Sequence, residues 1–407
     1  MVISPRDCAN LRHSLDGTYV VVSFCLPDII WIFNRLIGRY HIPDPLPWAD
    51  LAAPLAVAED ALARLDERLS GSPIREGWIA RTHFADAAAC VALQGELVRL
   101  EDLVLHDARM DVRAPSHELT RAHAVLRARR RIANAGPAWA LSPSGLDSLR
   151  GRAQVPNEPE TARGQEEETE VALTFPDSPN TPDCESDAWA AQLAAIDAVV
   201  ARSERALAGK PVRKAADPPA IVDADRDEDA RLAAWSAVLE RTAQLPPVLA
   251  AALAAQAWAT IAPLRSAAWL GRLLVPALLR ARGKTKAHLL CLNSGLRSLP
   301  RGRRHIADGT TSLPLWIEAI SAAASAGLKE HDRWLAARNQ LERKLVGRRS
   351  TSKLPALIEL ALATPIASAG MIAARLGVTP RAAQDLVAEL GLREATGRGR
   401  YRAWGIV

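Results

Sequence analysis

The sequence has few cysteines and few aromatic residues. Five cysteines (Cys8, Cys25, Cys90, Cys184 and Cys291) are scattered without a C-x-x-C pair, so neither a disulfide framework nor a zinc site is indicated. Aromatic residues make up 4% of the 407 residues, and much of the 49% hydrophobic content is alanine. Because alanine, leucine, arginine and glutamate favour helices, we expect a mainly α fold of two or three domains.

Long apolar runs are also missing, as is an evident signal peptide. The run from Tyr19 to Leu26 is too short to cross a bilayer. The alanine-rich stretch after Pro247 is interrupted by three arginines, so it is interpreted as a protein core and not as a membrane span. The expectation is a cytoplasmic protein with no membrane partner, no metal and no cofactor.

Acidic residues are absent from Arg241 to Ala307, although the net charge of the whole chain is only +5. Such a stretch can form a face for nucleic acid or an acidic partner, or an ordinary solvated surface. Residues 158–187 show the opposite bias, with ten acids and one arginine among several prolines. Because this composition cannot bury a core, residues 151–187 are interpreted as a disordered acidic insertion.

The chain before this insertion is expected to be largely helical. Residues 1–45 stay unassigned, apart from a candidate strand at Val20–Phe24. Residues 46–150 are expected to form helices, because their apolar residues recur with a period close to 3.6. One of these helices, at 119–132, is rich in arginine and is expected to be solvated.

Residues 188–346 are expected to form a helical core with a helical tail. The stretch around which the chain is organised, Leu245–Asn293, reads as two buried alanine-rich helices joined by a short loop at Pro263–Trp269. Two amphipathic helices, at 313–328 and 331–346, are expected to follow it.

The loop between the two buried helices carries no catalytic constellation. Phosphoryl or nucleotidyl transfer needs a base, a counter-charge or Mg²⁺, and backbone amides that are free to hold phosphate. Ala262 has no proton acceptor, and Ser266 supplies no carboxylate for a metal. Trp269 places a large ring where a glycine-rich loop would let a phosphate approach. The sequence therefore predicts no catalytic residues and a protein that is not an enzyme.

The same stretch resembles the Fic domain of protein AMPylators, in which a helix ends in the loop H-P-F-x-[D/E]-G-N-G-R-x-G-R. Arg272–Leu279 is similar to the R-L-L-x-P-x-L-L run that opens the next helix of that family. The resemblance implies a Fic-like helical body with a degenerate catalytic motif. The motif positions for histidine, proline, phenylalanine, the acidic metal ligand and the closing Gly-Arg fall on Ala262, Pro263, Leu264, Ser266, Gly271 and Arg272.

A second Fic-like segment precedes the insertion. Fic proteins of this layout carry an inhibitory motif, [S/T]-x-x-x-E-G, whose glutamate pairs with an arginine of the catalytic loop. Here the segment reads Cys90-Val-Ala-Leu-Gln94-Gly95, so the serine is replaced by Cys90 and the glutamate by Gln94. The resemblance implies that the inhibitory charge was lost together with the catalytic base. Cys90 and Gln94 are equally acceptable as ordinary helix residues.

The last segment, residues 347–407, has the pattern of a winged helix-turn-helix domain. Helices are expected at 354–363 and 368–376 and from Pro380 to Leu390. Gly377 suits the tight turn between the second and third helices, Thr379 and Pro380 suit the start of the third helix, and Gly391 suits its end. The inward-facing residues are expected to be Ile372, Ala373, Leu376, Ala383, Leu386 and Val387, and Trp404 is expected to lie in the core.

DNA contacts are expected from two places in this domain. Thr379, Arg381 and Gln384 lie on the exposed face near the start of the third helix, the end that enters the major groove. Residues 392–406 are expected to form the wing, a hairpin of two short strands. Arg398, Arg400 and Arg402 alternate along this hairpin and suit phosphate or minor-groove contact. Against this reading, Asp385 and Glu389 share the exposed side of the helix, and winged helices also bind proteins.

As a whole, the chain resembles a plasmid-associated group of rhizobial-type proteins of unknown function that end in a helix-turn-helix domain. The hypothesis is a DNA-binding protein, a transcriptional regulator, whose inactive helical body serves homodimerisation or binding of a protein partner. Two alternatives stay open. One is a residual nucleotide-dependent modifier of the AMPylator type that uses Arg272, and the other is a plasmid-maintenance or toxin–antitoxin component.

Overall fold

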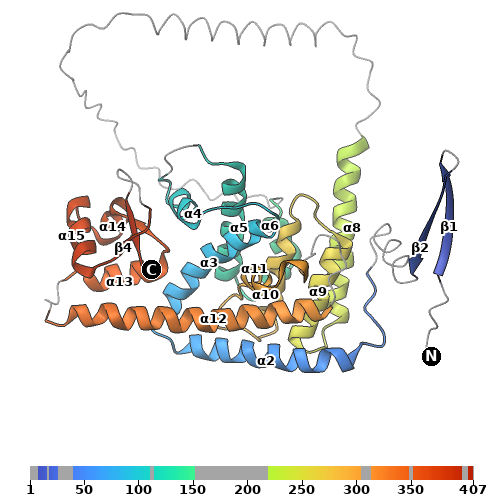
Figure 1. The fold of residues 1–407 in the computed structure, drawn as a ribbon, viewed down its shortest axis with the longest axis horizontal. Coiled ribbons are helices and arrows are strands. Elements are labelled where there is room, and N and C mark those ends of the chain that lie inside the picture. Colours follow the sequence, from blue (N-terminus) through green and yellow to red (C-terminus); the bar gives the residue numbers. More distant parts are fainter. Residues whose placement is uncertain are drawn as a thin grey trace, which may run out of the picture. The chain divides into compact units, whose positions relative to one another are not determined.

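The computed structural model describes most of the chain outside the acidic segment. The described ranges are 8–15, 18–25, 40–110, 114–151, 219–303, 313–347, 352–396 and 402–406. Within them the chain is mainly helical and ends in a helix-turn-helix domain, which confirms the expected fold class (Figure 1). The predicted acidic insertion falls outside the described residues apart from its first position.

A two-stranded antiparallel sheet and a series of helices make up the first part of the chain. The predicted strand at Val20–Phe24 lies within the second of the two strands. The elements are β1 (Cys8–Leu15), β2 (Thr18–Cys25), α2 (Trp48–Ser70), α3 (Arg75–Ala92), α4 (Leu100–Asp107), α5 (His117–Asn134), the 3-10 turn η1 (Trp139–Leu141) and α6 (Pro143–Leu149).

After the insertion, one long helix forms where the sequence predicted two helices. The prediction of two amphipathic helices at 313–328 and 331–346 was wrong, because a single helix, α12, continues through residues 329 and 330. The elements are α8 (Pro219–Arg241), α9 (Pro247–Ile261), η2 (Ala268–Leu270), α10 (Gly271–Ala281), α11 (Leu292–Ser298), η3 (Arg301–Arg303), α12 (Leu313–Glu342) and η4 (Arg343–Leu345).

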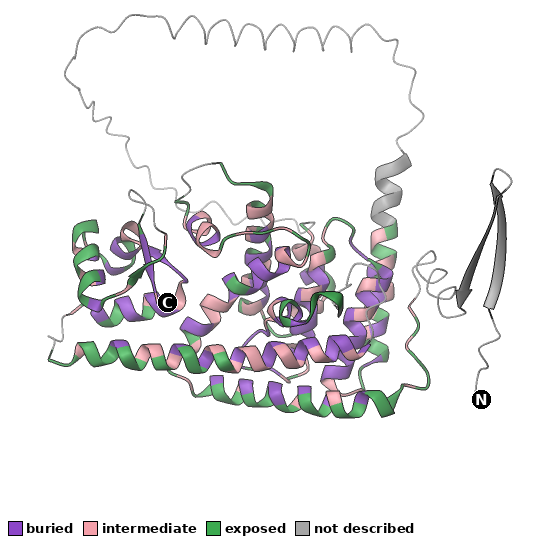
Figure 2. Ribbon diagram, in the orientation of Figure 1, coloured by how far each residue is buried: buried purple, intermediate pink, exposed green. Residues whose placement is uncertain are grey.

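Helices α2 and α12 lie side by side along one edge of the fold (Figure 1). The buried face of α2 carries leucine and alanine at helical spacing, and its other face is exposed (Figure 2). A Cβ at Gly327 of α12 would lie 2.8 Å from a methyl carbon of Leu65, so the absence of a side chain there permits close packing. Helix α2 also contacts α9, so its buried face packs mainly against α12 and to a lesser extent against α9.

Helix α9 is buried on nearly all sides. All but three of its 15 residues are buried, as expected for a helix that is apolar around its whole circumference. It contacts α10 and α12, and its Ala254 carbonyl oxygen accepts a hydrogen bond from the buried Trp235 indole at 2.9 Å. The prediction of two buried helices joined by a short loop is confirmed. Among the described helices, none combines the length and the apolar character that a membrane crossing requires.

Several cations of the acid-free stretch serve as internal contacts. Arg282 donates hydrogen bonds to the carbonyl oxygens of Thr242 at 2.8 Å and Leu239 at 3.2 Å, at the end of α8. Arg280 donates to the Ile132 carbonyl at 2.9 Å, and Lys284 forms an ion pair with Glu59. These side chains bind carbonyl oxygens near helix ends and neutralise a carboxylate. They are therefore not presented together as a basic surface.

Candidate functional site

The C-terminal domain is built from three helices and three short strands. Helices α13 (Leu354–Ala363), α14 (Ala369–Leu376) and α15 (Pro380–Leu390) have the bounds expected from the sequence, within one residue. Strands β3 (Ala367–Ser368), β4 (Arg393–Glu394) and β5 (Ala403–Gly405) form an antiparallel sheet in the order β3-β5-β4. This is the arrangement of a winged helix, with β4 and β5 as the wing strands.

Local chemistry fixes the turn between α14 and α15. Gly377 adopts a left-handed conformation, with φ 65° and ψ 45°, that a residue without a Cβ takes at little cost. The Thr379 hydroxyl accepts a hydrogen bond from the Ala382 backbone N–H at 3.2 Å, and Pro380 occupies the first helical position. Gly391, with φ 68°, ends α15 in the same left-handed conformation.

The core of this domain is close to the expected set. Ile372, Ala373, Leu376, Ala383 and Val387 are buried, as predicted. The prediction for Leu386 was wrong in degree, because this side chain is half-buried at the edge of the helix face. Trp404 is buried, with 7% of its surface exposed, and pairs through β5 with Ala367 and Glu394 on the two neighbouring strands.

The residues predicted to contact bases lie on one exposed surface. Thr379, Arg381 and Gln384 are all exposed at the start of α15. The Arg381 guanidinium lies 3.8 Å from the Asp385 carboxylate, and their side chains are 84% and 68% exposed. An ion pair this open is weak, so Arg381 can exchange Asp385 for another acceptor.

The wing arginines are only partly described. Arg402 is exposed and donates a hydrogen bond from Nε to Glu394 Oε2 at 2.8 Å, across the β4–β5 pair. Its guanidinium also lies 5.5 Å from the centre of the Trp404 ring. Arg398 and Arg400 lie outside the described residues. Of the three wing arginines, the one that the structure describes is therefore already paired with a carboxylate.

The domain is held to the helical body through α13. The Cβ of Leu362 lies 3.1 Å from the position that a Cβ would take at Gly77, so α3 and α13 pack closely. Arg81 of α3 donates hydrogen bonds to the carbonyl oxygens of Ala361 at 2.9 Å and Thr364 at 2.8 Å, at the end of α13. Its burial lowers the pKa of the guanidinium to about 10. Arg81 was missed from the sequence, since its acceptors are about 280 residues away.

A second candidate site is a cavity of about 420 Å³ in the body. It brings together Ala262, Gly271 and Arg272, three of the positions that the sequence comparison assigned to a Fic-like motif, with Gln94 of the segment assigned to an inhibitory motif. Pro263, Leu264, Ser266 and Gly95 do not line it. The remaining lining residues are apolar and come from α9, η2, α12 and the end of α3: Leu93, Ala255, Trp258, Ala259, Ala268 and Trp316.

The loop backbone around this cavity is sharply turned. Ala262 adopts a left-handed conformation, with φ 48° and ψ 60°, and its N–H donates to the Trp258 carbonyl at 2.9 Å. Gly271 is packed so closely that an added Cβ would lie 2.3 Å from the Trp258 ring. Pro263 and Leu264 are buried, whereas Ser266 is exposed. The close approach of Gly271 and a hydrogen bond from the Trp258 indole to the Ala268 carbonyl thus hold the Trp258 ring in place as one wall of the cavity.

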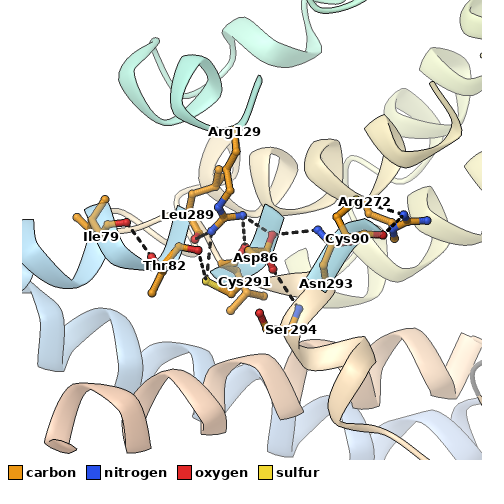
Figure 3. A network of polar contacts seen from close by, with 11 residues as sticks. Ile79, Thr82, Asp86, Cys90, Arg129, Arg272, Leu289, Cys291, Asn293 and Ser294 are labelled. Atoms are coloured by element: carbon orange, nitrogen blue, oxygen red, sulfur yellow. Dashed lines mark hydrogen bonds and ion pairs between the residues drawn. The ribbon is translucent and has the colours of Figure 1, made fainter. Parts of the chain in front are cut away.

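Among the described residues that line this cavity, Arg272 is the one ionisable side chain. Its Nε donates to Asn293 Oδ1 at 2.8 Å, and its Nη2 lies 3.3 Å from both the carbonyl oxygen and the Sγ of Cys90 (Figure 3). Burial raises the pKa of the Cys90 thiol, although the nearby Arg272 guanidinium acts in the opposite direction. Cys90 therefore stays a neutral thiol, and not a nucleophilic thiolate.

The Arg272 contacts continue into a buried ion pair. Asn293 donates from Nδ2 to Asp86 Oδ2 at 2.9 Å, and Arg129 donates from Nη1 to the same oxygen at 2.8 Å (Figure 3). Both Asp86 and Arg129 are fully buried. The expectation that the arginine-rich helix is solvated was therefore wrong for Arg129, which also donates to the carbonyl oxygens of Leu289 and Leu290.

Comparison with known proteins shows two matching family models and one similar full-length protein. Residues 354–407 match a family model described as "HTH DNA binding domain", and residues 220–346 match one described as "Protein of unknown function (DUF1612)". The chain is 46% identical over 373 residues to "Uncharacterized protein y4cF" of Sinorhizobium fredii (strain NBRC 101917 / NGR234), which covers 88% of the chain and 97% of that protein. This chain belongs to the same family as y4cF.

Membership of the y4cF family supports part of what the sequence predicted. The helix-turn-helix DNA-binding domain and the relation to a rhizobial protein are confirmed. The matches do not show a Fic identity for the body, nor a plasmid association. The model match at 220–346 begins in α8 and ends just after η4, so it spans the second part of the body, including α9, α10 and the loop between them.

Proposed function

We propose that this protein is a transcriptional regulator that binds DNA through α15 and the wing of its C-terminal domain. The observation that carries the proposal is the exposed surface of Thr379, Arg381 and Gln384 at the amino end of α15. Residues 354–407 as a whole match a helix-turn-helix DNA-binding domain. The contacts described above join this domain to the body through α13, and the residues at the start of α15 are exposed.

The chemistry of these residues suits recognition of DNA. Arginine can donate two parallel hydrogen bonds to guanine, and glutamine can pair with adenine, both in the major groove. The positions of Arg381 and Gln384, near the start of α15, correspond to those from which a recognition helix reads base edges. Arg398, Arg400 and Arg402 are assigned to phosphate contacts, which fix position without reading sequence.

The body is proposed to act by binding and not by catalysis. A transferase using this cavity needs a base and a carboxylate for a metal, whereas the polar side chains of its lining are Gln94 and Arg272. The meeting of Gln94 with Ala262, Gly271 and Arg272 around one cavity supports a Fic-like ancestry for the body. On this proposal the body serves homodimerisation or binding of a protein partner. The chain then comprises five parts: an unassigned segment (1–45), Fic-like helices (46–150), an acidic insertion (151–187), a helical core and tail (188–346) and the DNA-binding domain (347–407).

The test begins with sequencing the DNA that co-purifies with the full-length protein, followed by anisotropy titration of a labelled duplex of that sequence. Arg381→Ala and Gln384→Ala should each weaken specific binding by about 1–3 kcal/mol and relax the preference at one base pair. Arg297→Ala, an exposed arginine of α11, is the matched control and should leave affinity unchanged.

Two outcomes would contradict the proposal. One is a purified protein from which no DNA sequence is enriched over the input. The other is a specific duplex whose affinity does not change with either substitution in α15, since the recognition surface would then lie elsewhere.

A further inference from the structure

The cavity around Arg272 has a composition that the proposed DNA-binding function does not use. Its walls are two buried indole rings, Trp258 and Trp316, together with alanine side chains from α9. Its rim includes the exposed residues Gln94, Ala262 and Ala268, so it opens to solvent. A volume of about 420 Å³ lies within the range of pockets that hold small molecules.

Arg272 brings an uncompensated positive charge to this apolar cavity. Among the described residues, no carboxylate forms an ion pair with it, and its acceptors there, Asn293 and Cys90, are neutral. These contacts use Nε and Nη2 of Arg272. The two N–H groups of Nη1 have no acceptor among the described residues. A half-buried guanidinium in apolar surroundings favours an anion as its partner.

The Trp316 side chain contributes apolar surface to the cavity and no donor. Its indole Nε1 is buried without a hydrogen-bond acceptor among the described residues and is closed to solvent, so a molecule in the cavity does not reach it. The N–H groups of Arg272 Nη1 are therefore the charged donors available to a bound anion.

The lining also selects the kind of anion. A polyphosphate requires several cations or a cradle of backbone N–H groups, which glycine-rich loops provide. The loop between α9 and α10 instead has Ala267, Ala268 and Trp269. Among the described residues, the lining of the cavity contributes one cation, Arg272. A single guanidinium facing two aromatic walls matches one carboxylate attached to an apolar body.

We propose that the cavity binds a small monocarboxylate with an aromatic or similarly apolar body, held by Arg272 and packed between Trp258 and Trp316. The site goes beyond DNA binding, because its residues all belong to the helical body. Binding there requires no covalent chemistry, so it is compatible with a lining that lacks a base.

The test is isothermal titration of the full-length protein with naphthalene-2-carboxylate and with its uncharged analogue, naphthalene-2-carboxamide. The carboxylate should bind, and the affinity of the carboxamide should be lower by about tenfold or more, because the carboxamide cannot form the charge-assisted hydrogen bonds. Inorganic phosphate and ATP serve as further probes, and each should bind more weakly than the naphthoate.

Two variants and one control locate the site. Arg272→Met should lower affinity for the carboxylate about tenfold or more, and Ala259→Phe, which fills the cavity while keeping Arg272, should abolish binding of both naphthalene compounds. Arg265→Met removes an exposed arginine of the same loop that does not line the cavity, and it should leave binding unchanged. Far-UV circular dichroism checks the fold of each variant.

Several results would overturn the proposal. These are no binding of the naphthoate up to millimolar concentration, equal binding of acid and amide, and naphthoate binding that survives Ala259→Phe in a folded protein. Preferential binding of ATP or phosphate would show a phosphate pocket and refute the carboxylate assignment. If Arg272→Met does not fold, the comparison of acid with amide and the Ala259→Phe variant decide the question.

Discussion

Removing the charge of Asp86 should destabilise the protein more than almost any other single charge substitution in the body. Asp86 and Arg129 are both fully buried and are joined at 2.8 Å between Asp86 Oδ2 and Arg129 Nη1. In the Asp86→Asn variant the guanidinium keeps only neutral acceptors, such as the carbonyl oxygens of Leu289 and Leu290. Breaking a buried ion pair on one side costs about 3–5 kcal/mol in free energy of unfolding.

The same reasoning predicts a small effect at an exposed pair. Asp60 and Arg64 of α2 form an ion pair with side chains that are 58% and 66% exposed, so Asp60→Asn should cost about 0–1 kcal/mol. The double substitution Asp86→Leu with Arg129→Met leaves no unpaired charge, and it should cost less than Asp86→Asn alone. Comparison of Asp86→Asn with the double variant therefore tests the cost of an uncompensated buried charge and not merely that of lost contacts.

The assay is urea unfolding of each variant, followed by far-UV circular dichroism at constant pH and salt, with the slope against urea checked for constancy. A cost for Asp86→Asn no greater than that of Asp60→Asn would refute the reasoning. So would a double variant that is clearly less stable than the single one, because packing and not charge would then dominate.

Three further predictions concern packing, pH and DNA affinity. Gly295→Val should destabilise the contact of α11 with α12, because a Cβ there would lie 2.4 Å from a backbone oxygen of α12, and a lower thermal midpoint than wild type checks this. Burial raises the pKa of Asp66, but hydrogen bonds from His288 and two backbone N–H groups outweigh it and lower the pKa overall. Asp66 therefore adds stability above its unfolded pKa that is lost as the pH falls through the folded pKa, and Asp66→Asn should reduce this acid sensitivity in unfolding curves at several pH values. Glu394→Gln should release Arg402 from its ion pair, so duplex affinity should rise and its dependence on salt should steepen by up to about one unit in the log–log slope.

The features that the sequence predicted well depend on neighbouring residues. The start of α15 follows from Thr379 and Pro380, and its end follows from Gly391, because capping and left-handed turns are decided within one helical turn. The burial of α9 follows from its uninterrupted apolar composition. In each case the physical cause lies within a few residues of its effect.

The features that the sequence did not predict depend on distant partners. Arg129 belongs to an arginine-rich helix and reads as solvated, yet Asp86, 43 positions earlier, provides the carboxylate that makes its burial tolerable. The patterns at 313–328 and 331–346 read as two helices, whereas one continuous helix forms, and its Gly327, which costs only about 1 kcal/mol within a helix, allows α12 to approach Leu65 of α2. Neither partner can be identified without the fold.

Helix α3 contacts both the DNA-binding domain and the cavity of the body. Near its start, Gly77 and Arg81 contact α13 of the DNA-binding domain. At its end, Cys90 accepts hydrogen bonds from Arg272, and the adjoining Leu93 and Gln94 line the cavity. A molecule that draws Arg272 away from Cys90 would alter the end of a helix on which the domain is mounted. Contiguity alone is not coupling, and a bound molecule changes DNA affinity only if its own affinity differs between the DNA-bound and free forms. Titrating the specific duplex with and without saturating naphthalene-2-carboxylate measures that difference directly, and reciprocity requires the same factor in the affinity for the carboxylate.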